Sequence, residues 1–221
     1  YRMALYSLGS TDQNAGATLV QDLTTSMPTV KNSASSIGLI TMPDKSYDMY
    51  PATDFDSLFT RLNNDITAGG TGSTTTDRQK ILFVVTDGMS DSVWVDPRVC
   101  AGYKYNAPNG GPRTGFSTMP DTCIEAFDPL YQCDNLKNKN VRIAILYTTY
   151  PAPTQVGPGP TDPITDIVGH FIAYVPTFLK NCASPDLYLE VPTSADIETY
   201  MQTLLDRVMP QRATTMVRFR N

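Results

Sequence analysis

The sequence predicts an α/β fold in three layers, with helices on both faces of a mostly parallel β-sheet. Residues 81–85 form an apolar run that is too hydrophobic for a strand with one face in water. Residues 141–147 form a second, largely apolar run, and amphipathic helices alternate with such strands along the chain. This alternation predicts parallel strands joined by right-handed crossovers. With 221 residues, 41% of them hydrophobic, the chain can form one such domain, 1–221.

The first forty residues predict three elements. Residues 1–8 alternate as a strand does and end at Gly9-Ser10. Residues 18–23 form a second short piece, either extended or helical. Residues 30–40 predict a helix whose small side chains allow close packing.

After a loop over 43–51, a clearer helix starts at Thr53, a good N-cap residue. Its apolar residues recur at helical spacing and predict a buried stripe: Phe55, Leu58, Phe59 and Leu62. Residues 68–76 are rich in Gly and Thr, which predicts a flexible linker into the strand at 80–86. Since Gly69-Gly70-Thr71-Gly72 precedes that strand and lacks Gly-Lys-Ser/Thr, it does not predict a phosphate-binding loop.

Periodicity is lost after Asp91, and residues 92–123 predict a long surface insertion. A helix is expected over 124–138, before the strand at 141–147. A loop follows over 151–163, where proline and glycine leave no room for a helix.

A further helix is expected over 164–181, kinked or divided by Pro176, and a short strand over 187–191. The final helix begins after Ser194, its expected cap, and ends near residue 208. Its predicted buried face is Ile197, Met201, Leu204, Leu205 and Val208.

Composition narrows the range of functions. Charged residues make up only 18% of the chain and the net charge is −5. The basic residues are scattered, which argues against a nucleic-acid partner. No apolar stretch reaches the length of a membrane span.

The four cysteines predict disulfides in an oxidising compartment, because none belongs to a Cys-x-x-Cys pair and His170 is the single histidine. We expect Cys100–Cys123 to close the surface insertion and Cys133–Cys182 to tie two helices, each worth roughly 3–4 kcal/mol. The alternative is four buried thiols in a cytosolic protein.

The strand at 80–86 ends in Thr86-Asp87-Gly88. Ligands bind at the carboxyl edge of open α/β sheets, and oxygen donors there suit Mg²⁺ or Ca²⁺. The alternative is that Asp87 caps the next helix and Gly88 only makes the turn.

Several segments resemble a known family. The order of elements around residues 85–88 is similar to that of a von Willebrand factor A domain. Residues 127–133, 141–154 and 182–191 resemble the carboxyl-terminal region of TadG-like proteins, which serve pilus assembly in the bacterial tight-adherence (Flp) system. The resemblance covers most of residues 53–208.

This resemblance implies a vWA/Rossmann-like domain on the periplasmic or cell-surface side, anchored through a membrane helix upstream of Tyr1. Family members bind a cation through Asp-x-Ser-x-Ser, a Thr and an Asp. Thr53 and Asp87 match the last two positions, but Asp-x-Ser-x-Ser does not occur. The first strand is therefore expected upstream of residue 1, or the cation site is degenerate. No cofactor is expected, and Mg²⁺ or Ca²⁺ only if upstream ligands exist.

The insertion carries aromatic residues suited to a protein interface, or alternatively to a small local core. The residues expected to make contacts are Asp91, Trp94, Tyr103 and Tyr105.

The leading hypothesis is a non-enzymatic module for protein binding and assembly, in Flp/Tad-type pilus biogenesis or adhesion, with protein partners from the pilus or envelope. One alternative is a structural subunit of a surface filament whose missing strand comes from a neighbour. Another is a secreted hydrolase that uses His170 or the pair Asp87 and Asp91; the chain has no Gly-x-Ser-x-Gly elbow to support it.

Overall fold

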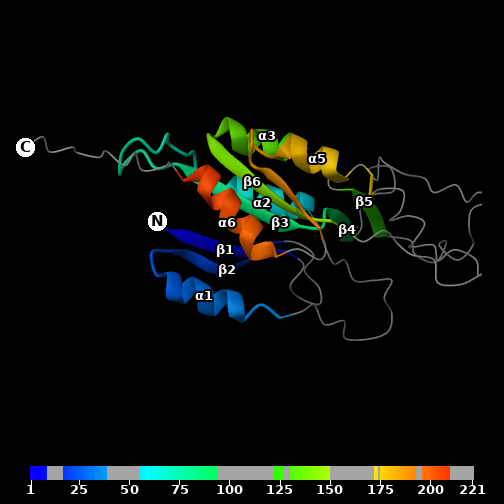
Figure 1. Ribbon diagram of the computed structural model, residues 1–221, viewed down its shortest axis with the longest axis horizontal. Helices are drawn as coiled ribbons and strands as arrows, with labels where there is room; N and C mark the ends of the chain where they lie inside the picture. The colour runs from blue at the N-terminus through cyan, green and yellow to red at the C-terminus, as the bar shows by residue number, and fades with distance from the viewer. Residues whose placement is uncertain are drawn as a thin grey trace, which may run out of the picture.

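The computed structural model describes residues 1–8, 17–38, 55–93, 122–126, 130–149, 172–173, 175–192 and 196–209. Within these ranges the chain is a mixed α/β structure (Figure 1). The strands are β1 (Met3–Leu8), β2 (Ala17–Thr24), β3 (Lys80–Thr86), β4 (Met89–Val93), β5 (Thr122–Ala126), β6 (Val141–Thr148) and β7 (Tyr188–Val191). The helices are α1 (Met27–Ser35), α2 (Phe55–Asp65), α3 (Leu130–Asn138), α5 (Val175–Cys182) and α6 (Ile197–Val208).

The parallel sheet has the order β3-β6-β7, with Phe83 opposite Ala144 and Leu146 opposite Leu189. Its central strand is β6, whose residues are almost all buried. The sequence predicts that β3 lies in the middle of the sheet, but among the described strands it pairs with β6 alone and stands at an edge, where Val85 is 51% exposed. An apolar run alone therefore does not distinguish an edge strand from a central one.

The parallel pairing is only part of the strand pattern. Of the four pairings between described strands, two are parallel and two, β1–β2 and β4–β5, are antiparallel. Both segments expected near the amino terminus are strands, and they form a separate hairpin. The expected mostly parallel sheet thus holds for β3, β6 and β7 only.

Helices cover both faces of the parallel sheet. On one face, Ile143 and Ile145 of β6 share a core with residues of α2, α3 and α5, such as Phe59, Leu136 and Leu179. Side chains alternate along a strand, so the neighbouring residues face the other way. There, Ala144 and Leu146 belong to two clusters that include Val208 and Leu204 of α6.

The hairpin joins the same core. Tyr6 and Leu8 of β1 pack against the cluster that contains α2. The Tyr6 hydroxyl donates to Asp65 Oδ2 at 3.1 Å, and Arg61 Nη1 donates to the Ala17 carbonyl at 3.0 Å. The α2 helix therefore spans the hairpin and the parallel sheet.

The apolar stripe predicted for α2 is confirmed, since Phe55, Leu58, Phe59 and Leu62 are all buried. In α6, Leu204 and Val208 are buried as expected, but Ile197 is 47% exposed. Ile197 is the first residue of the helix, whereas the buried residues lie in its second half. The side chain of Asp196 caps this helix by accepting from the Glu198 amide, while Ser194 lies outside the described residues.

Three further predictions are corrected. Residues 122–126 are strand β5, so the helix expected over 124–138 begins only at Leu130. The described part of the helix expected over 164–181 is α5, where Pro176 is the second residue and needs no kink, because the first turn requires no amide donor. The segment 68–76 is a hydrogen-bonded loop, in which the Gly70 and Gly72 amides donate to the carbonyls of Arg78 and Asp77.

Candidate functional site

The parallel strands end side by side, which places their carboxyl ends along one edge. Thr86 lies opposite Tyr147, and Thr148 opposite Val191. Asp87 follows β3 directly, and its residue is exposed. The sequence correctly places a carboxylate and hydroxyl groups at this edge of the sheet.

The turn that presents Asp87 is held from both sides. The Gly88 amide donates to Thr86 Oγ1 at 2.9 Å, and Gly88 has a φ of +74°. A Cβ at Gly88 would collide with the side chain of Val175, the first residue of α5. Gly88 is followed by β4, so the alternative that Asp87 caps a helix is wrong, whereas the turn at Gly88 is confirmed.

The next strand end is also fixed by hydrogen bonds. Thr149 follows β6, and its amide and hydroxyl donate to the Val191 carbonyl at 3.0 and 3.2 Å. Within β7, the hydroxyl of Tyr188 donates to Glu190, the residue before Val191, at 2.9 Å. Partial burial and this bond raise the pKa of Tyr188, so that it stays neutral. The edge is a rigid, polar surface.

Of the two residues expected to bind a cation, Thr53 and Asp87, the structure describes only Asp87. Thr53 lies outside the described residues, two positions before α2 begins. Within the described ranges, no three His, Cys, Asp or Glu side chains gather as a metal site would require. Cation binding by Thr53 and Asp87 stays a prediction.

The insertion has a two-stranded base. Strands β4 and β5 pair Val93 with Thr122 and Asp91 with Ile124, so residues 92, 93, 122 and 123 belong to strands rather than to the loop. Asp91 and Cys123 have described backbones, but their side chains lie outside the described set. The same holds for the whole of Trp94, Cys100, Tyr103 and Tyr105, so the Cys100–Cys123 bond and the aromatic surface stay predictions.

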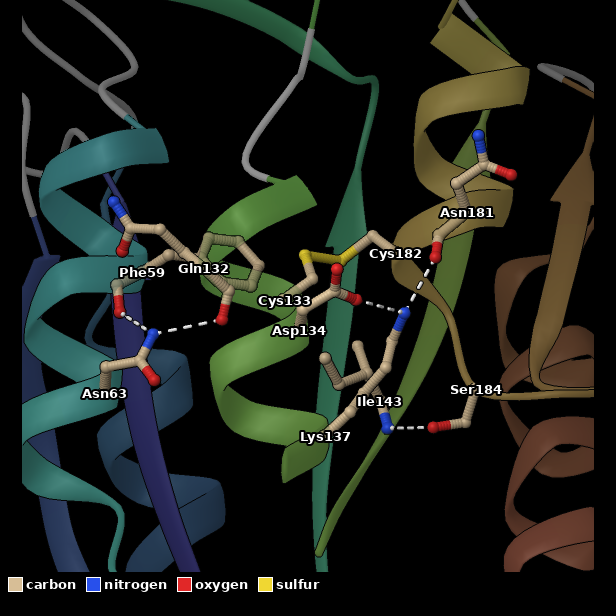
Figure 2. The surroundings of a disulfide bond; sticks show 10 residues. All are labelled: Phe59, Asn63, Gln132, Cys133, Asp134, Lys137, Ile143, Asn181, Cys182 and Ser184. Atoms are coloured by element: carbon tan, nitrogen blue, oxygen red, sulfur yellow. Dashed lines mark hydrogen bonds and ion pairs between the residues drawn. A yellow bond between two sulfur atoms is a disulfide. The ribbon is translucent and has the colours of Figure 1, made fainter. Parts of the chain in front are cut away.

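The second expected disulfide is confirmed. Cys133 of α3 and Cys182 of α5 are bonded, with Cα atoms 5.3 Å apart, and both are fully buried. Figure 2 shows the bond between the two helices and Lys137 reaching across to the Asn181 carbonyl at 2.8 Å. A disulfide is compatible with an oxidising compartment.

Polar contacts continue this network to α2. Asn63 donates through Nδ2 to the carbonyls of Phe59 and Gln132, at 2.9 and 3.1 Å (Figure 2). On the other side of the bond, Ser184 Oγ accepts from the Ile143 amide at 2.9 Å. The helices on this face are therefore cross-linked to each other and to β6.

A second region, at the opposite end of the sheet, was missed by sequence reasoning. An open cavity of about 540 Å³ is lined by residues of the loop 68–78, among them Arg78, and by Arg2 and Lys80. The carboxylate of Asp77 accepts from the Thr71 and Ser73 side chains and the Thr71 amide, which lowers the pKa of Asp77. The sequence signal that could have predicted this cavity is the pair of basic residues, Arg78 and Lys80, that follows the glycine-rich segment. Arg2 is far from them in the sequence, and only the fold brings it to the cavity.

Comparison with known proteins supplies no relative: no family model, no curated protein and no solved structure matches the chain. No helix in the described part is both long enough and apolar enough to cross a membrane.

Proposed function

We propose that the chain is a non-enzymatic assembly module of a bacterial envelope or surface protein, with a von Willebrand factor A-like domain of the TadG-like type. It binds protein partners in Flp/Tad-type pilus biogenesis or adhesion. The observation that carries this proposal is the exposed Asp87, held by a rigid turn at the carboxyl edge of a parallel sheet.

The edge suits a protein partner. Its polar groups are fixed by bonds within the domain, such as those from Thr149 to Val191, so little ordering is needed on binding. The strands β4 and β5 lead directly from this edge into the insertion, where the expected contact residues Trp94, Tyr103 and Tyr105 lie. A rigid scaffold that presents an adjacent long loop is a frequent arrangement for recognition.

The buried disulfide supports a location outside the cytosol. Cys133 and Cys182 join two helices over the core, a use of cysteine that is rare where glutathione keeps thiols reduced. A periplasmic or cell-surface location accounts for this bond.

Site-specific photo-crosslinking tests the proposal. A photo-reactive phenylalanine derivative replaces Asp87 in cells that make the whole protein, and a second variant carries it at Thr75. Thr75 is also exposed but lies in the loop at the opposite end of the sheet. We expect a discrete product with an envelope protein from position 87 only. Identical products at both positions, or products with cytosolic proteins alone, contradict the proposal.

A further inference from the structure

Three basic side chains line the open cavity at the end of the parallel sheet opposite Asp87. Arg78 ends the loop 68–78, Lys80 begins β3, and Arg2 directly precedes β1. The loop and the start of β1 lie at the same end of the molecule (Figure 1). Because like charges repel at short range, a cluster of three cations is stabilised by an anion that enters the cavity.

The positive charges of these side chains are not neutralised within the described ranges. Arg78 donates through Nε to the Thr75 carbonyl at 2.8 Å, and Lys80 donates through Nζ to the Thr67 carbonyl at 2.9 Å. Both acceptors are uncharged. Arg2 is exposed and makes no hydrogen bond or ion pair with the described part of the chain. The three cations therefore keep donors that can contact a ligand.

The acidic residue in the cavity lining, Asp77, is held by other groups. Its Oδ2 accepts from the Thr71 amide at 3.0 Å and from the hydroxyls of Thr71 and Ser73. No ion pair joins it to a cation among the residues that the structure describes. Three cations and one carboxylate give the lining a net positive charge, although the chain as a whole carries −5. The cavity is thus a positive site on an acidic protein.

Bonds to the rest of the domain hold the loop that forms the cavity wall. The Gly69 amide donates to the Lys139 carbonyl at 2.8 Å, and Asn140 Nδ2 donates to the carbonyls of Gly69 and Gly70 at 3.2 and 3.1 Å. A Cβ at Gly69 would collide with the Asn140 carbonyl, and one at Gly70 would collide with Asp77. Since the wall is closely packed and already ordered, little conformational entropy is lost when a ligand binds.

We propose that the cavity lined by Arg2, Arg78 and Lys80 binds a phosphate monoester. Guanidinium groups match phosphate oxygens with paired N–H donors, and an ammonium group adds a third positive charge. A phosphate monoester carries nearly two negative charges at neutral pH, which suits the net charge of the lining better than a single carboxylate does. This site is separate from the protein-binding edge around Asp87 and does not depend on it.

Side chains, rather than loop amides, hold the phosphate in this site. The amides of Gly70 and Gly72 each donate at 2.7 Å, to the carbonyls of Arg78 and Asp77, so they do not point at a ligand as those of a glycine-rich phosphate loop do. The available donors are the N–H groups of Arg2, the terminal nitrogens of Arg78 and the remaining N–H of Lys80.

The size of the cavity indicates what the phosphate is attached to. Its volume of about 540 Å³ lies within the usual range for small-molecule sites and exceeds what one phosphate group fills. A body the size of glycerol or a sugar fits beside the phosphate. Because the cavity is open to solvent, the phosphate can belong to a soluble ester or to a lipid headgroup.

An NMR titration with glycerol 3-phosphate tests this inference. The amide signals of Gly69, Gly70 and Arg78 should shift together and saturate, with a dissociation constant of about 1 mM or lower. Glycerol and sodium acetate at the same concentrations should leave these signals unchanged. No saturable shift with glycerol 3-phosphate, or an equal response to acetate, overturns the inference.

Three variants separate the site from general attraction of anions. Arg2→Gln removes no contact with the described residues, so the fold should be unaffected, while binding should weaken at least about tenfold. Arg78→Gln should have a similar effect on binding. Lys31→Gln is the matched control, because Lys31 is exposed on α1 and its loss changes the net charge equally. It should change the dissociation constant by less than about twofold. Equal effects of Arg2→Gln and Lys31→Gln overturn the inference.

Vesicle co-sedimentation distinguishes the two sources of the phosphate. Vesicles of phosphatidylcholine are compared with vesicles that also contain phosphatidic acid. Binding that requires phosphatidic acid and is lost in Arg2→Gln assigns a lipid headgroup, whereas binding of glycerol 3-phosphate alone assigns a soluble ester. Vesicle binding that Arg2→Gln leaves unchanged, without a response to glycerol 3-phosphate, overturns the inference. Arg2→Gln should not alter crosslinking from position 87, so either proposal can fail while the other stands.

Discussion

Gly88 turns the chain at the end of β3 directly against the side chain of Val175, the first residue of α5. A side chain at Gly88 has no room beside Val175, and Leu179 Cδ1 would lie 3.2 Å from its Cβ. This close approach links the turn that presents Asp87 to the helix that carries Cys182.

Replacing Gly88 by alanine should therefore destabilise the fold. The positive φ and the collision with Val175 together predict a loss of about 2–4 kcal/mol in the free energy of unfolding, measured with urea. Gly38→Ala is the matched control, because a Cβ at Gly38 meets nothing within 4 Å, and it should change stability by less than about 0.5 kcal/mol. Equal effects of the two substitutions would contradict the packing described for Gly88.

The Cys133–Cys182 bond should contribute much of the stability. It joins positions 49 residues apart, for which loop-closure entropy predicts about 4 kcal/mol at 25 °C. The double variant Cys133→Ala, Cys182→Ala should lose roughly that amount in guanidinium unfolding. Asp134→Ala, on the same helix, removes only an exposed ion pair with Lys137 and should cost less than about 1 kcal/mol. A loss below about 1 kcal/mol for the double variant would show that the bond is dispensable.

Asn63 should contribute more to the free energy of unfolding than its neighbour Asn64. Its amide group donates to carbonyls of α2 and α3, so Asn63→Ala removes the hydrogen bonds that join these helices and should cost about 0.5–1.5 kcal/mol. Asn64 is exposed, and Asn64→Ala should change the free energy of unfolding by less than about 0.5 kcal/mol. If thermal unfolding shows the two variants to be equally stable, Asn63 does not link the helices.

The sequence predicts a structural feature correctly where that feature depends on a single helix or strand. The stripe from Phe55 to Leu62 follows from helical spacing, and the strands at β6 and β7 follow from apolar runs with turns on either side. The Cys133–Cys182 pairing was expected to tie two helices, and it joins α3 to α5. The position of Asp87 followed from the strand that precedes it.

Features that depend on neighbours were missed. Whether β3 is central or at an edge depends on which strands lie beside it, which its own five apolar residues do not encode. Ile197 fits the apolar period of α6 but is the first residue of the helix and is 47% exposed, whereas Leu204 and Val208 are buried. Residues 124–126 were assigned to a helix, because β4, the partner of their strand, lies beyond an insertion of nearly thirty residues.

The loop around Asp77 should respond to pH in a defined direction. Bonds from Thr71 and Ser73 lower the pKa of Asp77, so its contribution to stability is present above the ordinary aspartate pKa, near 4, and is lost as pH falls through the lowered value. The stability difference between wild type and Asp77→Asn should thus shrink below about pH 4. By NMR titration, Thr71→Val should raise the pKa of Asp77 toward its ordinary value, and an unchanged pKa would exclude the Thr71 hydroxyl as the main cause.

Export of a disulfide-bonded chain is the central claim, and intact mass of the protein from its source cells, used to count its free thiols, tests it most directly. The mass is measured before and after alkylation, with and without reduction. We expect no alkylated thiol without reduction, and four alkylated cysteines in these residues after reduction. Four thiols alkylated without reduction would contradict the export.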